Sequence, residues 1–356
     1  THRQSSAASD VYKRQVNDED HVKGYLHYGR PGKNFDYSMT LLIASIDIND
    51  NPQSPSYPAL SYLSKEILPG QGGSPFNVPV IWYGRPLGSA FPSPNSPKVI
   101  SQYHLSNSFF FNISEELDFE LSITASEHEN KHTRPDIIQS RFEDAIKGQG
   151  GINENEQWNI FLPLENSESL INYIKGSESS IRIGSLISLD GVFTGNRNNF
   201  DFALGFQFNA EDLDINYSEE SRAAFDKDGK LTKSADLLFL GGGKNVNTKR
   251  KKQAVFFEVK NNFNEDLDII LSGRYEKLEK NSSFDPKFSF KYLATNNFFV
   301  RGSIGTSFTA PSMAQMFSSD IRLGSVRDIN DSPFVRLALL GLSLIHISEP
   351  TRRKHI

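Results

Sequence analysis

The sequence contains no cysteine and only 2 tryptophans among its 356 residues. Without cysteine, the chain can form neither a disulfide framework nor a thiolate metal site. It also lacks any run approaching the ~18 consecutive apolar residues of a membrane helix, and no apolar N-terminal segment is typical of a secretory signal. A membrane is not excluded by these absences, because alternating strands of about ten residues can also cross one.

Basic residues are too few for a general nucleic-acid binder. Lys and Arg number 38 against 43 Asp and Glu, which gives a net charge of −5, whereas neutralising phosphates requires a basic face. Hydrophobic residues make up only 37%, a low share for a globular core. The chain is instead rich in strand formers, with 27 Phe and 12 Tyr. The composition therefore favours an all-β fold that is unusually polar for its size.

Ten segments alternate apolar and polar residues with the period of a strand. In the clearest, Leu117, Phe119 and Leu121 share one face, and Asp118 and Glu120 share the other. The ten predicted strands are residues 21–29, 37–47, 102–111, 117–127, 180–193, 199–209, 253–263, 267–277, 287–293 and 298–308.

The connections between these segments alternate strictly between short and long. The three longest cover 48–100, 128–180 and 210–252, and a short connection separates each pair. Membrane barrels have this arrangement, with short turns at one end and long loops at the other. We therefore predict an antiparallel transmembrane β-barrel. The alternative is a soluble β-sandwich that acts as a binding module, in which the apolar faces form a core; it leaves the alternation of loops unexplained.

The stretch RGSIGTSFTAPSMAQMF resembles a signature of TonB-dependent outer-membrane receptors, in which an arginine-led strand ends in Ser-Phe-Arg-Ala-Pro-Ser. Thr309 stands where the family has its usual arginine. Proline lacks an N–H for the ladder, so Pro311 is expected to mark the end of that strand. The matching residues are Arg301, Gly305, Ser307, Phe308, Ala310, Pro311, Ser312 and Phe317.

The resemblance extends upstream over most of residues 25–316, including FDFALGFQF and the segment 158–176. It implies a fragment of a receptor in the outer membrane of a Gram-negative bacterium, for energised uptake of a scarce nutrient such as a siderophore, cobalamin, a carbohydrate or a peptide. The implied partners are the TonB complex, through a plug domain not seen in this sequence, and lipid and lipopolysaccharide. No enzyme activity, cofactor or nucleic acid is implied.

Both ends of the chain look foreign to this family. Residues 9–15 and 342–353 resemble translated sequencing adapters. We therefore expect residues 1–20 and 326–356 to be artefactual or disordered, and residues 21–325 to form a partial barrel of about ten strands that cannot close by itself, because an open sheet edge is not tolerated in lipid.

One segment fits a zinc-hydrolase motif. HENKH would place His128 and His132 on one face of a helix, with Glu129 as general base. Its neighbours are poor helix formers and Pro135 follows closely, so we expect a polar loop, with His128 and His132 only weak candidates for binding metal.

Two further groups of residues are candidates for binding. The basic run Lys249, Arg250, Lys251 and Lys252 could pair with lipopolysaccharide phosphates, although most such runs are solvated. In the first long connection, Tyr57, Tyr62 and Trp82 could stack on a sugar or a chelate ring, with loop packing as the alternative.

Overall fold

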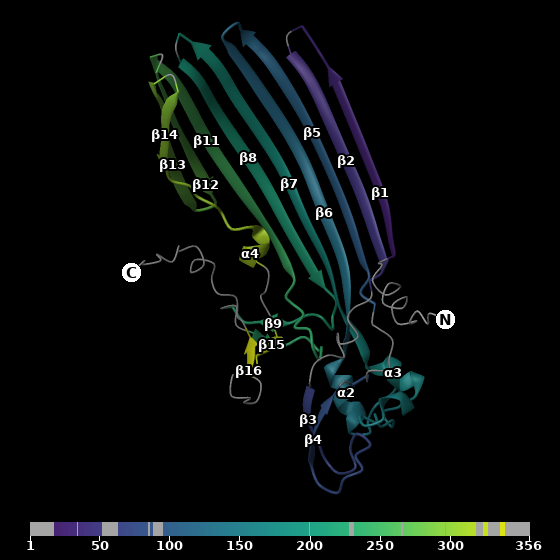
Figure 1. Ribbon diagram of the computed structural model, residues 1–356. Coiled ribbons are helices and arrows are strands. Elements are labelled where there is room, and N and C mark those ends of the chain that lie inside the picture. Colours follow the sequence, from purple (N-terminus) through teal and green to yellow (C-terminus); the bar gives the residue numbers. More distant parts are fainter. Residues whose placement is uncertain are drawn as a thin grey trace, which may run out of the picture.

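Ten long strands of the computed structural model form one open antiparallel sheet (Figure 1). Its edge strands are β1 (Asp18–Arg30) and β14 (Phe298–Gly305). Between them, in order, lie β2 (Phe35–Asp50), β5 (Lys98–Ser114), β6 (Leu117–Ile137), β7 (Lys175–Arg197), β8 (Phe200–Tyr217), β11 (Val246–Asn264), β12 (Leu267–Leu278) and β13 (Asn281–Thr295). The structure describes residues 18–33, 35–51, 63–84, 86–87, 95–198, 200–227, 231–264, 266–295, 297–317, 323–326 and 335–338.

Each of the ten predicted segments overlaps one of these strands, and every neighbouring pair is antiparallel. The all-β interpretation is therefore confirmed. The sheet does not close on itself within the described residues, as expected of an incomplete barrel.

Short hairpins join the strands at one end of the sheet, which we call the turn end. The long connections gather at the opposite end, the loop end, on whose side the tight hairpin between β12 and β13 also lies (Figure 1). Several strands run much farther toward the loop end than predicted, because β6 continues to Ile137 and β7 begins at Lys175. The prediction that 48–100, 128–180 and 210–252 are loops throughout is therefore wrong at their ends, which belong to strands.

One face of the sheet, which we call the apolar face, is apolar near the turn end. Ala125, Ile187 and Ala210 lie side by side in register on three adjacent strands and form the last apolar row. Two residues farther toward the loop end, the same face carries Glu127, Ser185 and Asp212. The side chains of the apolar face are not covered by other parts of the described chain: Ile187 is 59% exposed, Leu204 55% and Val255 52%.

The opposite face, which we call the polar face, carries hydroxyl and charged side chains. Ser108 and Ser122 share a hydrogen bond of 2.9 Å between β5 and β6, and His104 contacts Ser126 at 2.8 Å. The apolar face of the sheet therefore suits an apolar environment, and the polar face suits water.

The main apolar core lies outside the sheet, in a unit at the loop end that we call the cap. It comprises the hairpin β3 (Leu63–Ile67) and β4 (Val80–Gly84) together with residues 138–174, which include α2 (Gln139–Ile146), η1 (Pro163–Glu165) and α3 (Glu168–Ile174). Ser167 caps α3 by accepting a hydrogen bond from the N–H of Leu170 at 3.0 Å. The buried side chains of this core are Ile67, Ile137, Phe142, Ala145, Ile146, Trp158, Ile160, Leu170, Ile174 and Leu238.

Two short strand pairs and one helix lie outside the sheet and the cap. They are the pair β9 (Ala224–Phe225) and β10 (Leu231–Lys233), the helix α4 (Met313–Phe317), and the pair β15 (Leu323–Val326) and β16 (Val335–Ala338). Among the described residues, the sheets other than the ten-stranded one have two strands each, so none can cover its apolar face as a sandwich requires. The soluble β-sandwich is therefore not favoured. None of the described helices has the length and apolar character needed to span a membrane.

The final strand of the sheet ends earlier than Pro311. The ladder between β13 and β14 stops where Thr306 donates its N–H to the carbonyl of Pro286, at 3.0 Å. Because Pro286 has no N–H to return, the ladder cannot continue past it. The prediction that Pro311 ends the strand is thus wrong, and the proline that does so lies on the neighbouring strand.

Candidate functional site at the loop end of the sheet

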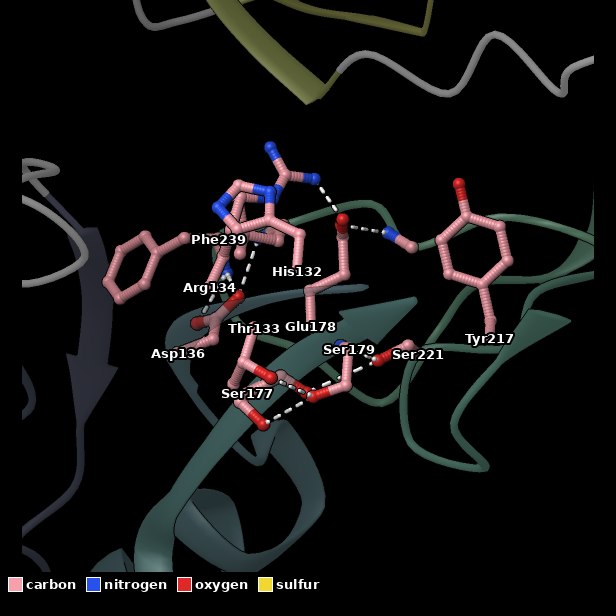
Figure 2. A network of polar contacts seen from close by, with 12 residues as sticks. His132, Thr133, Arg134, Asp136, Ser177, Glu178, Ser179, Tyr217, Ser221 and Phe239 are labelled. Carbon is pink, nitrogen blue, oxygen red and sulfur yellow. Dashed lines mark hydrogen bonds and ion pairs between the residues drawn. The ribbon is translucent and has the colours of Figure 1, made fainter. Parts of the chain in front are cut away.

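A network of buried polar groups joins the end of β6 to the connection between β8 and β11 (Figure 2). Asp136 is only 2% exposed. Its carboxylate accepts hydrogen bonds from the N–H groups of Ile137 at 2.7 Å, Phe239 at 3.2 Å and Leu240 at 2.7 Å. Burial raises the pKa of Asp136 to about 6, although the three hydrogen bonds oppose the shift. Asp136 therefore holds the connection between β8 and β11 against the end of β6.

A second buried carboxylate, Glu178 on β7, lies beside Asp136. It forms an ion pair with Arg134 and accepts the N–H of Gly242 at 3.0 Å. Gly242 has a φ of 61°, and a Cβ there would lie 2.0 Å from the carbonyl oxygen of Ser221. Only glycine fits this close approach. Two adjacent strands thus hold the same connection through separate carboxylates.

Hydroxyl groups extend the network across the strands. The N–H of Ser179 donates to Ser221 Oγ at 2.9 Å, and Ser179 Oγ donates to Thr133 Oγ1 at 3.2 Å (Figure 2). Ser221 is completely buried. These contacts tie β6, β7 and the turn after β8 into one unit.

His132 and Ser96 lie 3.0 Å apart, as a base and a nucleophile do in hydrolases. However, Ser96 is buried and its hydroxyl donates to the carbonyl of Thr133 at 2.9 Å. His132 Nε2 must therefore carry a proton and donate to Ser96, so it cannot serve as a base toward that hydroxyl. Burial, aided by the nearby Lys98, lowers the pKa of His132.

The predicted loop around HENKH is instead part of β6. In a strand, His128 and His132 lie on one face but about 13 Å apart along the chain, given a rise of ~3.3 Å per residue. This spacing is too long for two ligands of one zinc ion. Within the described part of the chain, no three His, Asp or Glu side chains are grouped so as to hold a metal ion. The zinc-hydrolase alternative is not favoured.

Nearer the middle of the sheet, the polar face carries a connected series of side chains. Arg274 on β12 donates to Gln207 at 2.9 Å and to Glu276 at 3.0 Å. Gln207 then donates to Asp190 at 2.6 Å, and Asp190 accepts from Ser188 at 2.5 Å. This series crosses four strands, and it gives the polar face a fixed pattern of charges.

The basic run lies within β11 and divides between the two faces. In register, Lys249 pairs with Asp212 and Lys251 with Ala210. Both lysines therefore lie on the apolar face, Lys251 level with the last apolar row and Lys249 just beyond it. Lys249 Nζ is 3.3 Å from Asp212. Arg250 and Lys252 belong to the polar face.

Arg250 is almost completely buried and has three partners. It forms an ion pair with Glu211, donates to the carbonyl of Pro311 at 2.6 Å, and lies 3.6 Å from the sulfur of Met316. This arginine therefore holds the segment after β14 against β11.

The residues of the predicted signature lie along one stretch. Arg301 and Gly305 belong to β14, and Phe317 ends α4. Between these elements, Phe308 is 44% exposed and Ser312 accepts the N–H of Gln315 at 3.2 Å. Ser307 and Ala310 lie in the same connecting stretch.

Of the aromatic residues suggested for ligand stacking, Tyr57 and Tyr62 lie outside the described residues. Trp82 is partly buried and packs against the core of the cap. The structure therefore places Trp82 among packing contacts and does not test a stacking role for the two tyrosines.

Sequence reasoning missed the buried carboxylates Asp136 and Glu178 and their partner Arg134. The available signal was weak: charged residues within TRPDI and SESSI, at positions where a continued strand would carry them. Their partners at Phe239 and Gly242 are too far along the chain for any local pattern to indicate.

Comparison with known proteins identifies the architecture. The sequence model described as "TonB dependent receptor-like, beta-barrel" matches residues 47–336. No curated protein matches the sequence. Similar solved structures include the siderophore receptor PirA from Acinetobacter baumannii, at 12% identity and a TM-score of 0.45, covering 83% of this chain and 34% of PirA. The ferric-catecholate import receptor Fiu from E. coli K12 has 10% identity and a TM-score of 0.45, over 82% of this chain and 43% of Fiu.

A third similar structure is BauA, the ferric preacinetobactin receptor from Acinetobacter baumannii. It has 10% identity and a TM-score of 0.42, over 81% of this chain and 40% of BauA. The chain thus spans less than half the length of each of these three receptors.

Proposed function

This chain belongs to the family of TonB-dependent receptor-like β-barrels, and from that premise we propose that it forms part of the barrel wall of an outer-membrane receptor for energised uptake of a scarce nutrient. The family consists of receptors and transporters, so the function is binding and transport. The nutrient classes that we propose are siderophores, cobalamin, carbohydrates and peptides. TonB, acting through a plug domain, would supply the energy.

The observation that carries the proposal is the contrast between the two faces of the sheet. On β6, the side chains of the apolar face are apolar from Leu117 to Ala125, a length of about 27 Å at ~3.4 Å per residue. Membrane barrels carry an outward apolar band of about 25 Å and a polar interior. The uncovered apolar face fits lipid, and the polar face fits a water-filled or plugged lumen.

In this orientation the turn end faces the periplasm, and the cap, on the long connections, faces the outside. External substrate would first meet the cap and the connection that Asp136 and Glu178 fasten. We propose these long connections as the substrate-binding region, together with the plug.

The test is transport by a full-length receptor that contains this segment, expressed in Gram-negative cells. Uptake would be measured with a ⁵⁵Fe-labelled siderophore panel, labelled cobalamin, and fluorescent oligosaccharides and peptides. We expect uptake of one class, and its loss when TonB is deleted or a protonophore is added. Uptake that persists without TonB would contradict the proposal.

We also propose that the two lysines on the apolar face, Lys249 and Lys251, bind lipopolysaccharide phosphates. Lys251 stands level with the last apolar row and Lys249 just beyond it, which places both near the outer headgroups in this orientation. Arg250 and Lys252, on the polar face, are less suited to that role.

Changing Lys249 and Lys251 together to Gln should lower the lipopolysaccharide that remains bound after detergent extraction of the full-length receptor. Lys252→Gln is the matched control, because it removes the same charge from the other face. Equal retention in the double variant and the wild type would exclude the proposed contact.

A further inference from the structure

A pocket of about 520 Å³ opens on the polar face near the turn end, far from the cap. Its charged lining consists of Lys260, Lys291, Arg301 and Asp268, which gives three cations and one carboxylate. Ser289 and Ser303 add two hydroxyl groups. The pocket therefore offers mainly positive charge and hydrogen-bond donors.

The register of β13 and β14 brings four of these side chains into one block. Lys291 lies directly opposite Arg301, and Ser289 lies directly opposite Ser303. Both pairs are on the polar face, two residues apart along each strand. Directly opposed residues have Cβ atoms about 5 Å apart, so all four side chains can reach a single small ligand.

Two like charges directly opposite each other destabilise a sheet, and a bound anion would offset their repulsion. Within the described residues, no ion pair involves Lys291 or Arg301. Asp268 lies opposite Lys291 on β12 but forms no ion pair with it there. Lys291 Nζ lies instead 5.9 Å from the centre of the Phe299 ring.

The third cation of the pocket is partly neutralised. Lys260 Nζ lies 3.8 Å from Asp201, a residue outside this pocket. The uncompensated positive charge is therefore concentrated at Lys291 and Arg301, on the two strands nearest the open edge of the sheet.

We propose that Ser289, Lys291, Arg301 and Ser303 form a binding site for a small oxyanion that carries carboxylate or phosphate oxygens. The guanidinium of Arg301 can hold two oxygens of such a group in a fork, Lys291 adds a point charge, and the two hydroxyls donate to the remaining oxygens. The site lies at the opposite end of the sheet from the cap, so it is separate from the proposed substrate-binding region.

The experiment is isothermal titration of the full-length receptor that contains this segment, in detergent micelles at low ionic strength, with inorganic phosphate in one series and succinate in the other. We expect at least one of the two anions to bind. Binding of phosphate, succinate or both then shows whether the site accepts phosphate oxygens, carboxylate oxygens or both. Arg301→Gln and Lys291→Gln should each weaken binding about tenfold, because each removes a charge-assisted contact. Arg301→Lys should bind with intermediate affinity, since it keeps the charge but loses the fork.

Lys287→Gln is the matched control, because Lys287 lies on the same strand and the same face but outside the pocket. Unchanged affinity in this variant, with weaker binding in the Arg301 and Lys291 variants, supports the site. The proposal is overturned if neither anion binds the wild type, or if Lys287→Gln weakens binding as much as Arg301→Gln.

Discussion

Asp136 shows how a single carboxylate can connect two distant parts of this chain. It is buried, and among the described residues its hydrogen-bond donors are all backbone N–H groups, with no cation hydrogen-bonded to it. Burial disfavours its charged form, while the hydrogen bonds favour it. Because burial dominates, the protonation of this one group affects how firmly residues 237–242 dock.

The docking of this connection should be stronger at acidic pH. The pKa of Asp136 is raised from 3.8 to about 6 in the folded state, so between these values the folded state binds the extra proton and stability falls as pH rises. A shift of about two units corresponds to about 3 kcal/mol, present below pH 4 and lost as pH rises through 6. Between pH 5 and pH 7.5 about half of this effect, roughly tenfold in the docking equilibrium, should appear in the hydrogen-exchange protection factors of Phe239 and Leu240.

Asp136→Asn is the control for this prediction. It keeps a carbonyl oxygen for the N–H groups but cannot ionise, so the difference between the two pH values should disappear. The nearby Glu178, Arg134 and His132 remain in this variant, so a pH dependence that persists would contradict the role of Asp136.

The strands illustrate why alternation reveals only part of an element. Period two is visible in β6 from Leu117 to Ala125, where one face is apolar and the other polar. Beyond Glu127 both faces carry polar side chains, and the pattern that signals a strand disappears. The HENKH segment lies in that part, which is why it was predicted to be a loop.

The assignment of faces on β8 can be tested with single cysteines, because these 356 residues contain none to interfere. Leu204 lies on the apolar face and its neighbour Ala203 on the polar face. A fluorophore on Leu204→Cys should be strongly quenched by brominated lipids after reconstitution, and one on Ala203→Cys much less.

The two labels are matched controls for each other, since adjacent residues share the same depth along the strand. Equal quenching at both positions would mean that the sheet does not separate lipid from a polar interior. Stronger quenching at Ala203→Cys would reverse the assignment of the faces.

For the whole molecule, the sequence predicted all ten strands of the sheet and the end at which the long connections gather. It could not predict the cap, whose core joins Ile67, Trp158 and Leu238 from three separate connections. The network of buried polar groups around Asp136 could not be predicted either, because Asp136 and its partner Phe239 are 103 residues apart. Local patterns report which faces are buried, but not which distant segments bury them.

The length of β6 determines how far the cap stands from the apolar rows. From Ala125 to Ile137 the strand continues for about 40 Å at ~3.4 Å per residue. On a bacterial cell this extension would lift the cap clear of the lipid headgroups and into the surrounding polysaccharide layer. The cap would then be the part of the receptor that antibodies and bacteriophages meet first.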